Sequence, residues 1–100
     1  MKDGRQRLDK WLWFARFAKT RSLAAKLVEG GFVRVNGQRV ETPAKQVGAG
    51  DVLTIAAPHT TVVVTVLAPG ERRGPTPEAR LLYAEAGRDD AALVRDPGSR

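Results

Sequence analysis

The sequence contains no cysteine and a single histidine, His59. The absence of cysteine excludes disulfides, thiolate metal sites and cysteine nucleophiles. One histidine without cysteine partners is a poor basis for a metal site, so we expect no metal and no other cofactor. A chain without cysteine fits a reducing compartment, and we expect a cytoplasmic location.

Long apolar runs are missing as well. No run approaches the ~18 residues of a membrane-spanning helix, and residues 1–10 carry charge without the apolar core of a signal peptide. We therefore expect no membrane partner. The 100 residues correspond to one domain with a modest core, which leaves no room for a second, catalytic domain.

Acidic residues are scarce in one half of the chain only. The net charge is +6 and the sequence pI is about 10.5. Residues 1–45 hold eleven basic and four acidic residues, a net charge of +7, whereas residues 46–100 hold six arginines and seven acids, a net charge of −1. This uneven excess predicts that the first half binds a polyanion, which can be nucleic acid or an anionic membrane surface, and of these we expect nucleic acid.

Apolar residues spaced three and four positions apart predict a first helix over residues 7–18. Thr20 can cap a second helix, because its hydroxyl can accept a hydrogen bond from the amide of Ser22 or Leu23. Gly30-Gly31 ends that helix, since glycine adopts the left-handed conformation without steric cost. The two buried stripes consist of Leu8, Trp11, Leu12, Ala15 and Ala18, and of Leu23, Ala24, Leu27 and Val28.

Most of the remaining pattern predicts a small, mainly antiparallel sheet. Asn36-Gly37 favours a tight hairpin, since both turn positions require a positive φ. Pro75-Thr76-Pro77 opens a third, short helix whose Leu81 and Leu82 face the body of the protein. The fold class is therefore α+β, two helices packed on the sheet with a third helix near the C-terminus. The predicted strands are residues 32–35, 38–40, 52–55 and 61–67.

The joint Lys19-Thr20-Arg21-Ser22 places two cations and two hydroxyls at a helix start, where free amides and the helix dipole attract anions. An ordinary N-cap with solvated neighbours is the alternative, and both roles can coexist. The compact cationic segment 7–37 suits a phosphate backbone better than a small-molecule pocket, so we expect no small-molecule substrate. The candidate contact residues are Arg5, Arg7, Lys10, Arg16, Lys19, Thr20, Arg21, Ser22, Lys26, Arg34, Asn36 and Lys45.

Trp13 and Phe17 lie opposite the apolar stripe of the first helix. They either pack under the C-terminal part or stack on unpaired bases, and packing is favoured because exposed aromatic residues are uncommon without a partner. Asp9 has no base or nucleophile beside it in the sequence pattern, so we expect an ion pair with Arg16 or Arg21. We predict no catalytic residue and no enzymatic activity.

Four motifs within residues 7–53 resemble, in order and spacing, the RNA-binding domain first described in ribosomal small-subunit protein four, the S-four-like domain. The resemblance implies that the cationic surface binds RNA by shape and phosphate recognition. The motifs are Arg7-Leu8-Asp9-Lys10, Lys19-Thr20-Arg21, Leu27-Val28-Glu29-Gly30-Gly31 and Val33-Arg34-Val35-Asn36-Gly37.

A longer resemblance, over about residues 5–86, is to the bacterial heat shock protein 15 family. It adds the start Arg7-Leu8-Asp9-Lys10-Trp11-Leu12-Trp13 and the later Arg72-Arg73-Gly74-Pro75, Glu78-Ala79 and Leu82-Tyr83. This resemblance implies a non-catalytic protein that binds ribosomal RNA of the free large ribosomal subunit carrying nascent chain–tRNA and aids its recycling. It leaves direct contact with tRNA open, and we expect a monomer.

The predicted organisation is a loose basic arm (1–6), the S-four-like domain with its sheet (7–68), a C-terminal helical extension (69–86) and a disordered tail (87–100). Two alternative functions remain. One is a fragment of an RNA-modifying enzyme of the pseudouridine synthase type, which the length and the lack of catalytic residues disfavour. The other is a DNA-binding module, since helix-turn-helix proteins also join two short helices by a tight turn.

Overall fold

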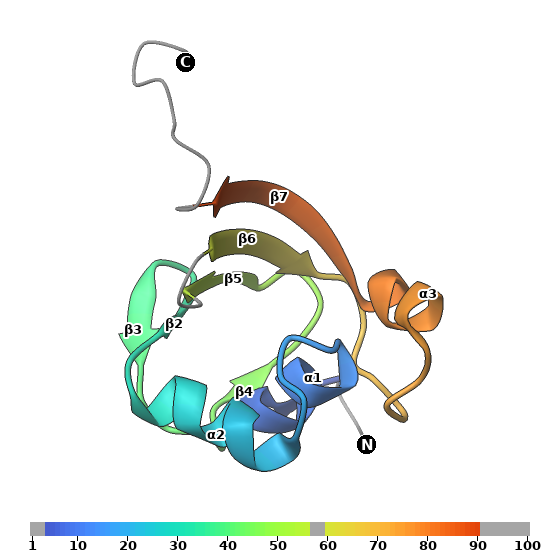
Figure 1. The fold of residues 1–100 in the computed structure, drawn as a ribbon, viewed down its shortest axis with the longest axis horizontal. Helices are drawn as coiled ribbons and strands as arrows, with labels where there is room; N and C mark the ends of the chain where they lie inside the picture. Colours follow the sequence, from blue (N-terminus) through green and yellow to red (C-terminus); the bar gives the residue numbers. More distant parts are fainter. Residues whose placement is uncertain (1–3, 57–59, 91–100) are drawn as a thin grey trace, which may run out of the picture.

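The computed structural model describes residues 4–56 and 60–90 and has an α+β architecture, as predicted (Figure 1). Expected features on 1–3, 57–59 and 91–100, including His59 and most of the predicted tail, lie outside these residues. In chain order the elements are β1 (Gln6–Arg7), α1 (Leu8–Phe14), α2 (Arg21–Glu29), β2 (Val33–Val35), β3 (Gln38–Val40), β4 (Gln46–Val47), β5 (Val52–Ala56), β6 (Thr60–Val66), α3 (Thr76–Ala79), the 3-10 helix η1 (Arg80–Leu82) and β7 (Tyr83–Asp90).

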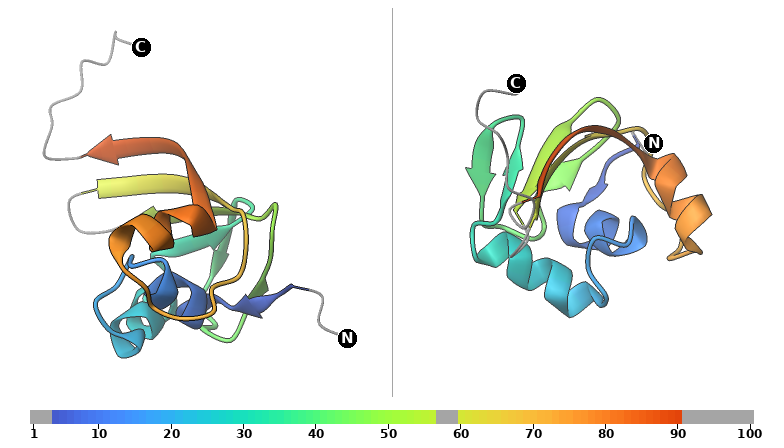
Figure 2. Two further views of the ribbon diagram at one scale, coloured as in Figure 1. Left: turned by 90° about the vertical axis from the view of Figure 1, so that its right-hand side faces the viewer. Right: turned by 45° about the horizontal axis from the view of Figure 1, so that its top comes forward.

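Five strands form one antiparallel sheet in the order β3-β2-β5-β6-β7, and β1 pairs with β4 in a separate two-stranded ladder. The large sheet curves over α1 and α2, and α3 lies at the end where β7 begins (Figures 1 and 2). The β2–β3 hairpin turns at Asn36 and Gly37, whose φ angles are +53° and +85°. This confirms the predicted hairpin, because both turn positions adopt the left-handed region.

The core lies between the concave face of the sheet and the two helices. Trp11 and Leu12 of α1 are completely buried, as are Leu53 of β5 and Val64 of β6. Side chains alternate along each strand, so every second residue enters this layer while its neighbours face away. The apolar stripe predicted for the first helix is confirmed, since all five of its members are buried.

Helix α2 begins and ends where its sequence predicts. The Thr20 hydroxyl accepts a hydrogen bond from the Leu23 amide at 3.1 Å. At the other end Gly31 has φ +81°, and the Gly31 and Phe32 amides donate to the carbonyls of Val28 and Leu27. These paired bonds form a Schellman motif, the usual way in which a helix ends on a left-handed residue.

Helix α1 is shorter than predicted, because it ends at Phe14 and not at residue 18. It ends in the same motif, with amide donation from Arg16 to the Trp13 carbonyl and from Phe17 to the Leu12 carbonyl. Arg16 occupies the left-handed position with φ +69°. No glycine marks this end, so the sequence pattern alone extended the helix too far.

The segment after β6 returns to the start of the chain. The Trp11 indole Nε1 donates to the Ala68 carbonyl at 2.9 Å. The side-chain amide of Gln6 donates through Nε2 to the Gly70 carbonyl at 2.8 Å. Its Oε1 accepts a hydrogen bond from the Gly70 backbone amide at 3.0 Å. Residue 6, expected in a loose arm, is therefore held in β1 with its side chain tied to residue 70.

The C-terminal extension differs from the predicted helix and tail. Its helical part ends at Leu82, and residues 83–90 form β7 along the outer edge of β6. Backbone pairing with an exposed edge needs no side-chain periodicity, which explains why the sequence pattern missed it. Leu81 is 71% exposed instead of facing the body, whereas Leu82 packs against the core.

Candidate nucleic-acid interface

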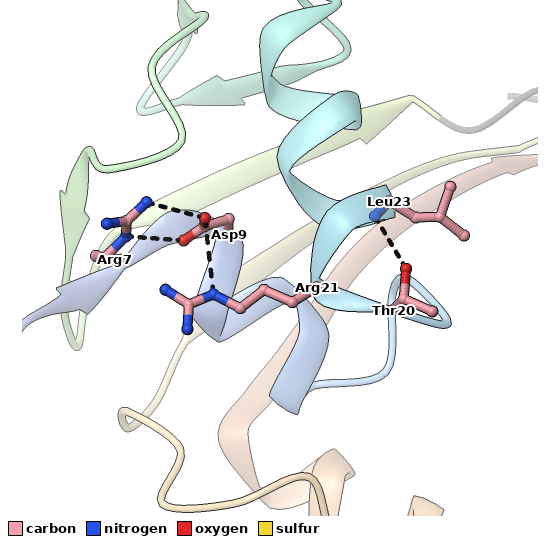
Figure 3. A network of polar contacts seen from close by, with 5 residues as sticks. All are labelled: Arg7, Asp9, Thr20, Arg21 and Leu23. Atoms are coloured by element: carbon pink, nitrogen blue, oxygen red, sulfur yellow. Dashed lines mark hydrogen bonds and ion pairs between the residues drawn. The ribbon is translucent and has the colours of Figure 1, made fainter.

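Asp9 joins the starts of the two helices through arginine side chains (Figure 3). Its carboxylate accepts from Nε and Nη2 of Arg7, both at 3.1 Å, and Nε of Arg21 lies 3.8 Å from Oδ2. Asp9 is only 4% exposed, whereas both arginine side chains are nearly half exposed. The predicted ion pair with Arg21 is confirmed, the one with Arg16 is not formed, and the bond to Arg7 was missed.

The buried carboxylate orients both guanidinium groups without covering them. A carboxylate–guanidinium pair with two parallel hydrogen bonds fixes the plane of the arginine. Arg21 uses only Nε toward Asp9, so its two terminal nitrogens stay directed away from the pair (Figure 3). Asp9 therefore acts here as a positioning residue for two cations.

Lys19 and Lys26 flank an apolar groove beside α2. The groove has a volume of about 620 Å³. Leu23, predicted to be buried, is 45% exposed at its edge, because Ala24 and Val28 form the buried face of α2. The other lining residues are Phe17, Ala18, Leu27 and Phe32.

A third group of cations gathers near the ladder of β1 and β4. Nη2 of Arg5 donates to the Gln46 carbonyl at 3.1 Å, and the Lys45 carbonyl accepts from the Leu8 amide at 2.8 Å. Burial raises the pKa of the nearby Asp51. This effect is outweighed by hydrogen bonds from the Gly48 amide and the Asn36 side chain and by the charges of Arg5 and Lys45. The pKa of Asp51 therefore lies below its ordinary value of 3.8.

Asn36 has a structural role at the hairpin turn. Its Nδ2 donates to Asp51 at 3.1 Å and its Oδ1 accepts from the Val52 amide at 2.9 Å. Both polar ends of this side chain are thus engaged within the protein. RNA contact by Asn36 remains a prediction.

Arg34 is separated from the cations of the helices. Val33 and Val35 on either side of it are buried, so Arg34 points to the opposite, outer face of the sheet. Its cross-strand partner there is Arg39, which forms an ion pair with Glu41 at 3.0 Å. The sequence pattern grouped Arg34 with the cations of the helices. A linear pattern does not show which face of the sheet a strand side chain points to relative to the helices.

The aromatic residues of α1 and its C-terminal loop pack within the protein, as favoured. Phe17 stacks on Trp11 with ring centroids 6.0 Å apart and touches Tyr83 at 4.9 Å. Trp13 stacks on Phe14 at 5.3 Å, and both Trp13 and Phe17 pack against the core.

Lys10, another predicted contact, has its Nζ 5.6 Å from the centroid of the Phe14 ring. At this distance the ammonium attracts the ring face. Lys10 therefore lies against α1 itself rather than extending freely from it. Its predicted contact with RNA is untested.

A fourth group of cations lies between the α1–α2 loop and the C-terminal extension. Arg16, Arg73 and Arg80 line one pocket of about 360 Å³. The sequence singled out Arg16 alone. In the sequence, Arg72-Arg73 was used only as part of a family motif, although a basic pair directly before Gly74-Pro75 was an available signal.

Within residues 4–56 and 60–90 no group of three or more histidine, cysteine or acidic residues could hold a metal. Over the same residues no helix combines the length and hydrophobicity needed to cross a bilayer.

Comparison with known proteins identifies an S4 domain over residues 6–53, which agrees with the predicted S-four-like domain. The fold, this match and the cationic helix pair define a small RNA-binding protein built on an S4 domain. Heat shock protein 15 of Escherichia coli K12 is 47% identical over 94 residues, covering 89% of this chain and 70% of that protein. The chain belongs to the heat shock protein 15 family.

Two further relatives support the same assignment. A solved structure described as the trimeric structure of Vibrio cholerae heat shock protein 15 is 46% identical, with a TM-score of 0.77 over 82% of each chain. Small ribosomal subunit protein uS4 of Jannaschia sp. is 32% identical over 93% of this chain but only 44% of its own length. The second match links this domain to a ribosomal protein.

Proposed function

We propose that the protein binds ribosomal RNA of the free large ribosomal subunit while that subunit carries nascent chain–tRNA, and that it aids recycling of the subunit. The protein acts in the cytoplasm, without catalysis, by recognising the shape and the phosphates of folded RNA. Direct contact with tRNA would follow if the bound surface includes the peptidyl-tRNA.

The gathering of cations on the helix pair carries this proposal. Arg7 and Arg21 are oriented by Asp9, and Lys19 and Lys26 border the groove beside α2. Each cation that neutralises a phosphate releases counterions, so several together bind RNA strongly and with steep salt dependence. Family membership directs the proposal toward ribosomal particles.

Sedimentation with purified ribosomal particles tests the proposal. The protein is mixed with large subunits that carry peptidyl-tRNA, with empty large subunits, or with small subunits. We expect preferential comigration with large subunits that carry peptidyl-tRNA. Equal binding to empty large subunits would contradict the peptidyl-tRNA part, and absence from every ribosomal fraction would contradict the proposal as a whole.

Variants locate the surface in the same assay. Lys19→Gln with Lys26→Gln should lower the affinity about 10-fold, because two phosphate contacts are lost. Arg39→Gln removes one positive charge on the outer side of the β2–β3 hairpin and serves as a control, with a change in affinity of less than about two-fold.

Competition between structured RNA and duplex DNA at equal salt excludes the DNA-binding alternative if RNA is the stronger competitor. A negative pseudouridine-formation assay excludes the enzyme alternative.

We further propose that the protein acts as a monomer on its target. The Vibrio cholerae relative has been solved as a trimer, so the oligomeric state of this chain needs its own measurement. Light scattering during gel filtration should give the mass of one 10.9 kDa chain. A mass near three chains would overturn this part of the proposal and leave RNA binding to be tested separately.

A further inference from the structure

Three arginines from separate parts of the chain converge on the pocket between α1 and the C-terminal extension. Arg16 comes from the loop after α1, Arg73 from the loop before α3, and Arg80 from η1. Residues 73 and 80 lie beyond the S4 match at 6–53. None of the three forms an ion pair with a carboxylate in the part of the chain that the structure describes.

The backbone at Arg16 is in a conformation that favours glycine. The φ angle of +69° is uncommon for a residue with a long side chain. Gly31 fills the equivalent position at the end of α2 with φ +81°. An arginine in a strained conformation, at a position where glycine would fit, indicates that its side chain has a use.

Arg73 is held inside the pocket wall with an unsatisfied donor. Its Nε is buried and has no hydrogen-bond partner. Its Nη2 donates a long hydrogen bond to the Ala18 carbonyl, with the two atoms 3.5 Å apart. A buried charged donor without an acceptor is costly, and an anion bound to the same guanidinium group would offset part of that cost.

The loop before α3 fixes which of the two successive arginines faces the pocket. Nε and Nη2 of Arg72 donate to the Glu78 carboxylate at 3.1 and 2.7 Å. Gly74 makes room for this pair, because a Cβ there would lie 2.6 Å from the Glu78 carboxylate. Arg72 is thereby paired with a carboxylate on the outside, whereas Arg73 lines the pocket without such a partner among the described residues.

We propose that Arg16, Arg73 and Arg80 bind a phosphate group of the RNA backbone. This inference rests on the proposed RNA-binding function and adds the C-terminal extension to the interface. Guanidinium groups match phosphate oxygens with paired hydrogen bonds. Phe17 borders both this pocket and the groove beside α2, so one RNA strand can pass from Lys19 to Arg73.

Fluorescence anisotropy with a labelled RNA hairpin over a series of salt concentrations tests the site. Arg73→Gln and Arg80→Gln should each weaken binding about 3- to 10-fold and reduce the slope of log affinity against log salt by about one. Arg16→Gly should weaken binding similarly while raising Tm by about 2–4 °C. Opposite changes in affinity and stability distinguish a ligand contact from a structural role. Arg39→Gln is the control for loss of one charge.

A second measurement on the unaltered protein covers the case in which a variant unfolds. Arginine Nε–Hε signals in NMR spectra are followed during addition of the hairpin or of inorganic phosphate. We expect the signals of all three arginines to shift at hairpin concentrations that saturate binding and to need far higher phosphate concentrations. Shifts with low phosphate that the hairpin does not displace would assign the pocket to a free anion and overturn the inference.

The outcomes separate this inference from the proposed function. If the unaltered protein binds neither the hairpin nor ribosomal particles, the proposed function fails. If it binds the hairpin but the three arginine variants, correctly folded, bind as tightly as the control, only the pocket is refuted. Unshifted arginine signals at saturating hairpin would refute the pocket in the same way.

Discussion

The two helices that form the basic surface differ in how their ends are made. Helix α2 is terminated by its own residues, with the Thr20 hydroxyl at its start and Gly31 past its end. Helix α1 has no side-chain cap at Arg7, and its first amides donate to the Lys45 and Pro43 carbonyls of a distant loop. Its end passes through Arg16 in place of glycine.

This difference bears on the role that we propose for Arg16. The start of α2 is capped by Thr20 within the helix itself, whereas the start of α1 depends on carbonyls of a distant loop. Arg16 and Gly31 carry the same backbone motif, so they can be compared directly. In α1 an arginine occupies the left-handed position, beside a pocket with two further arginines. This placement supports the proposed phosphate contact of the Arg16 side chain.

The largest effect expected within this comparison is at Gly31. Gly31→Ala should lower the free energy of unfolding by about 1–2 kcal/mol, because an L side chain is strained in the left-handed region. The added Cβ would also meet the Arg39 guanidinium, 2.3 Å away. Thermal unfolding followed by circular dichroism should show a Tm lower by about 4 °C or more. An unchanged Tm would mean that this helix end is not under the strain inferred.

The N-cap of α2 should contribute somewhat less. Thr20→Ala removes the acceptor of the Leu23 amide and should cost about 1 kcal/mol. Chemical denaturation measures the change, and Thr20→Ser serves as the control because it retains the hydroxyl. Equal losses in both variants would contradict a capping role for the hydroxyl.

The smallest change, of opposite sign, is expected at the end of α1. Arg16→Gly relieves the strained backbone, but glycine also gains freedom in the unfolded chain, so the net stabilisation should be about 0.5 kcal/mol. Denaturant titrations of the variant and the parent protein, performed side by side, resolve the sign. A loss of stability would show that the Arg16 side chain stabilises the fold, which would weaken the argument for a ligand contact.

The same contrast explains which elements the sequence predicted. The boundaries of α2 and of the β2–β3 hairpin follow from local signals, namely Thr20, Gly31 and Asn36-Gly37. The end of α1 was placed four residues too late because Arg16 gives no stop signal. The strand β7 was missed because its position depends on the free edge of β6, a tertiary feature.

The candidate site was predicted in part for similar reasons. Charge and helix position identified Lys19, Arg21 and Lys26 as members of one cationic region. The linear pattern did not separate Arg34, which the strand directs to the outer face. It also did not reveal that Arg73 approaches the α1–α2 loop, since 55 residues separate Arg73 from Ala18.

The two proposals together place RNA along the helix pair and onto the C-terminal extension. An NMR titration of the isotope-labelled protein with the RNA hairpin maps the bound surface directly. We expect the backbone amides of residues 16–26 and 73–80 to shift together at the same RNA concentration. Shifts confined to the β2–β3 hairpin, or to residues 16–26 without 73–80, would contradict it.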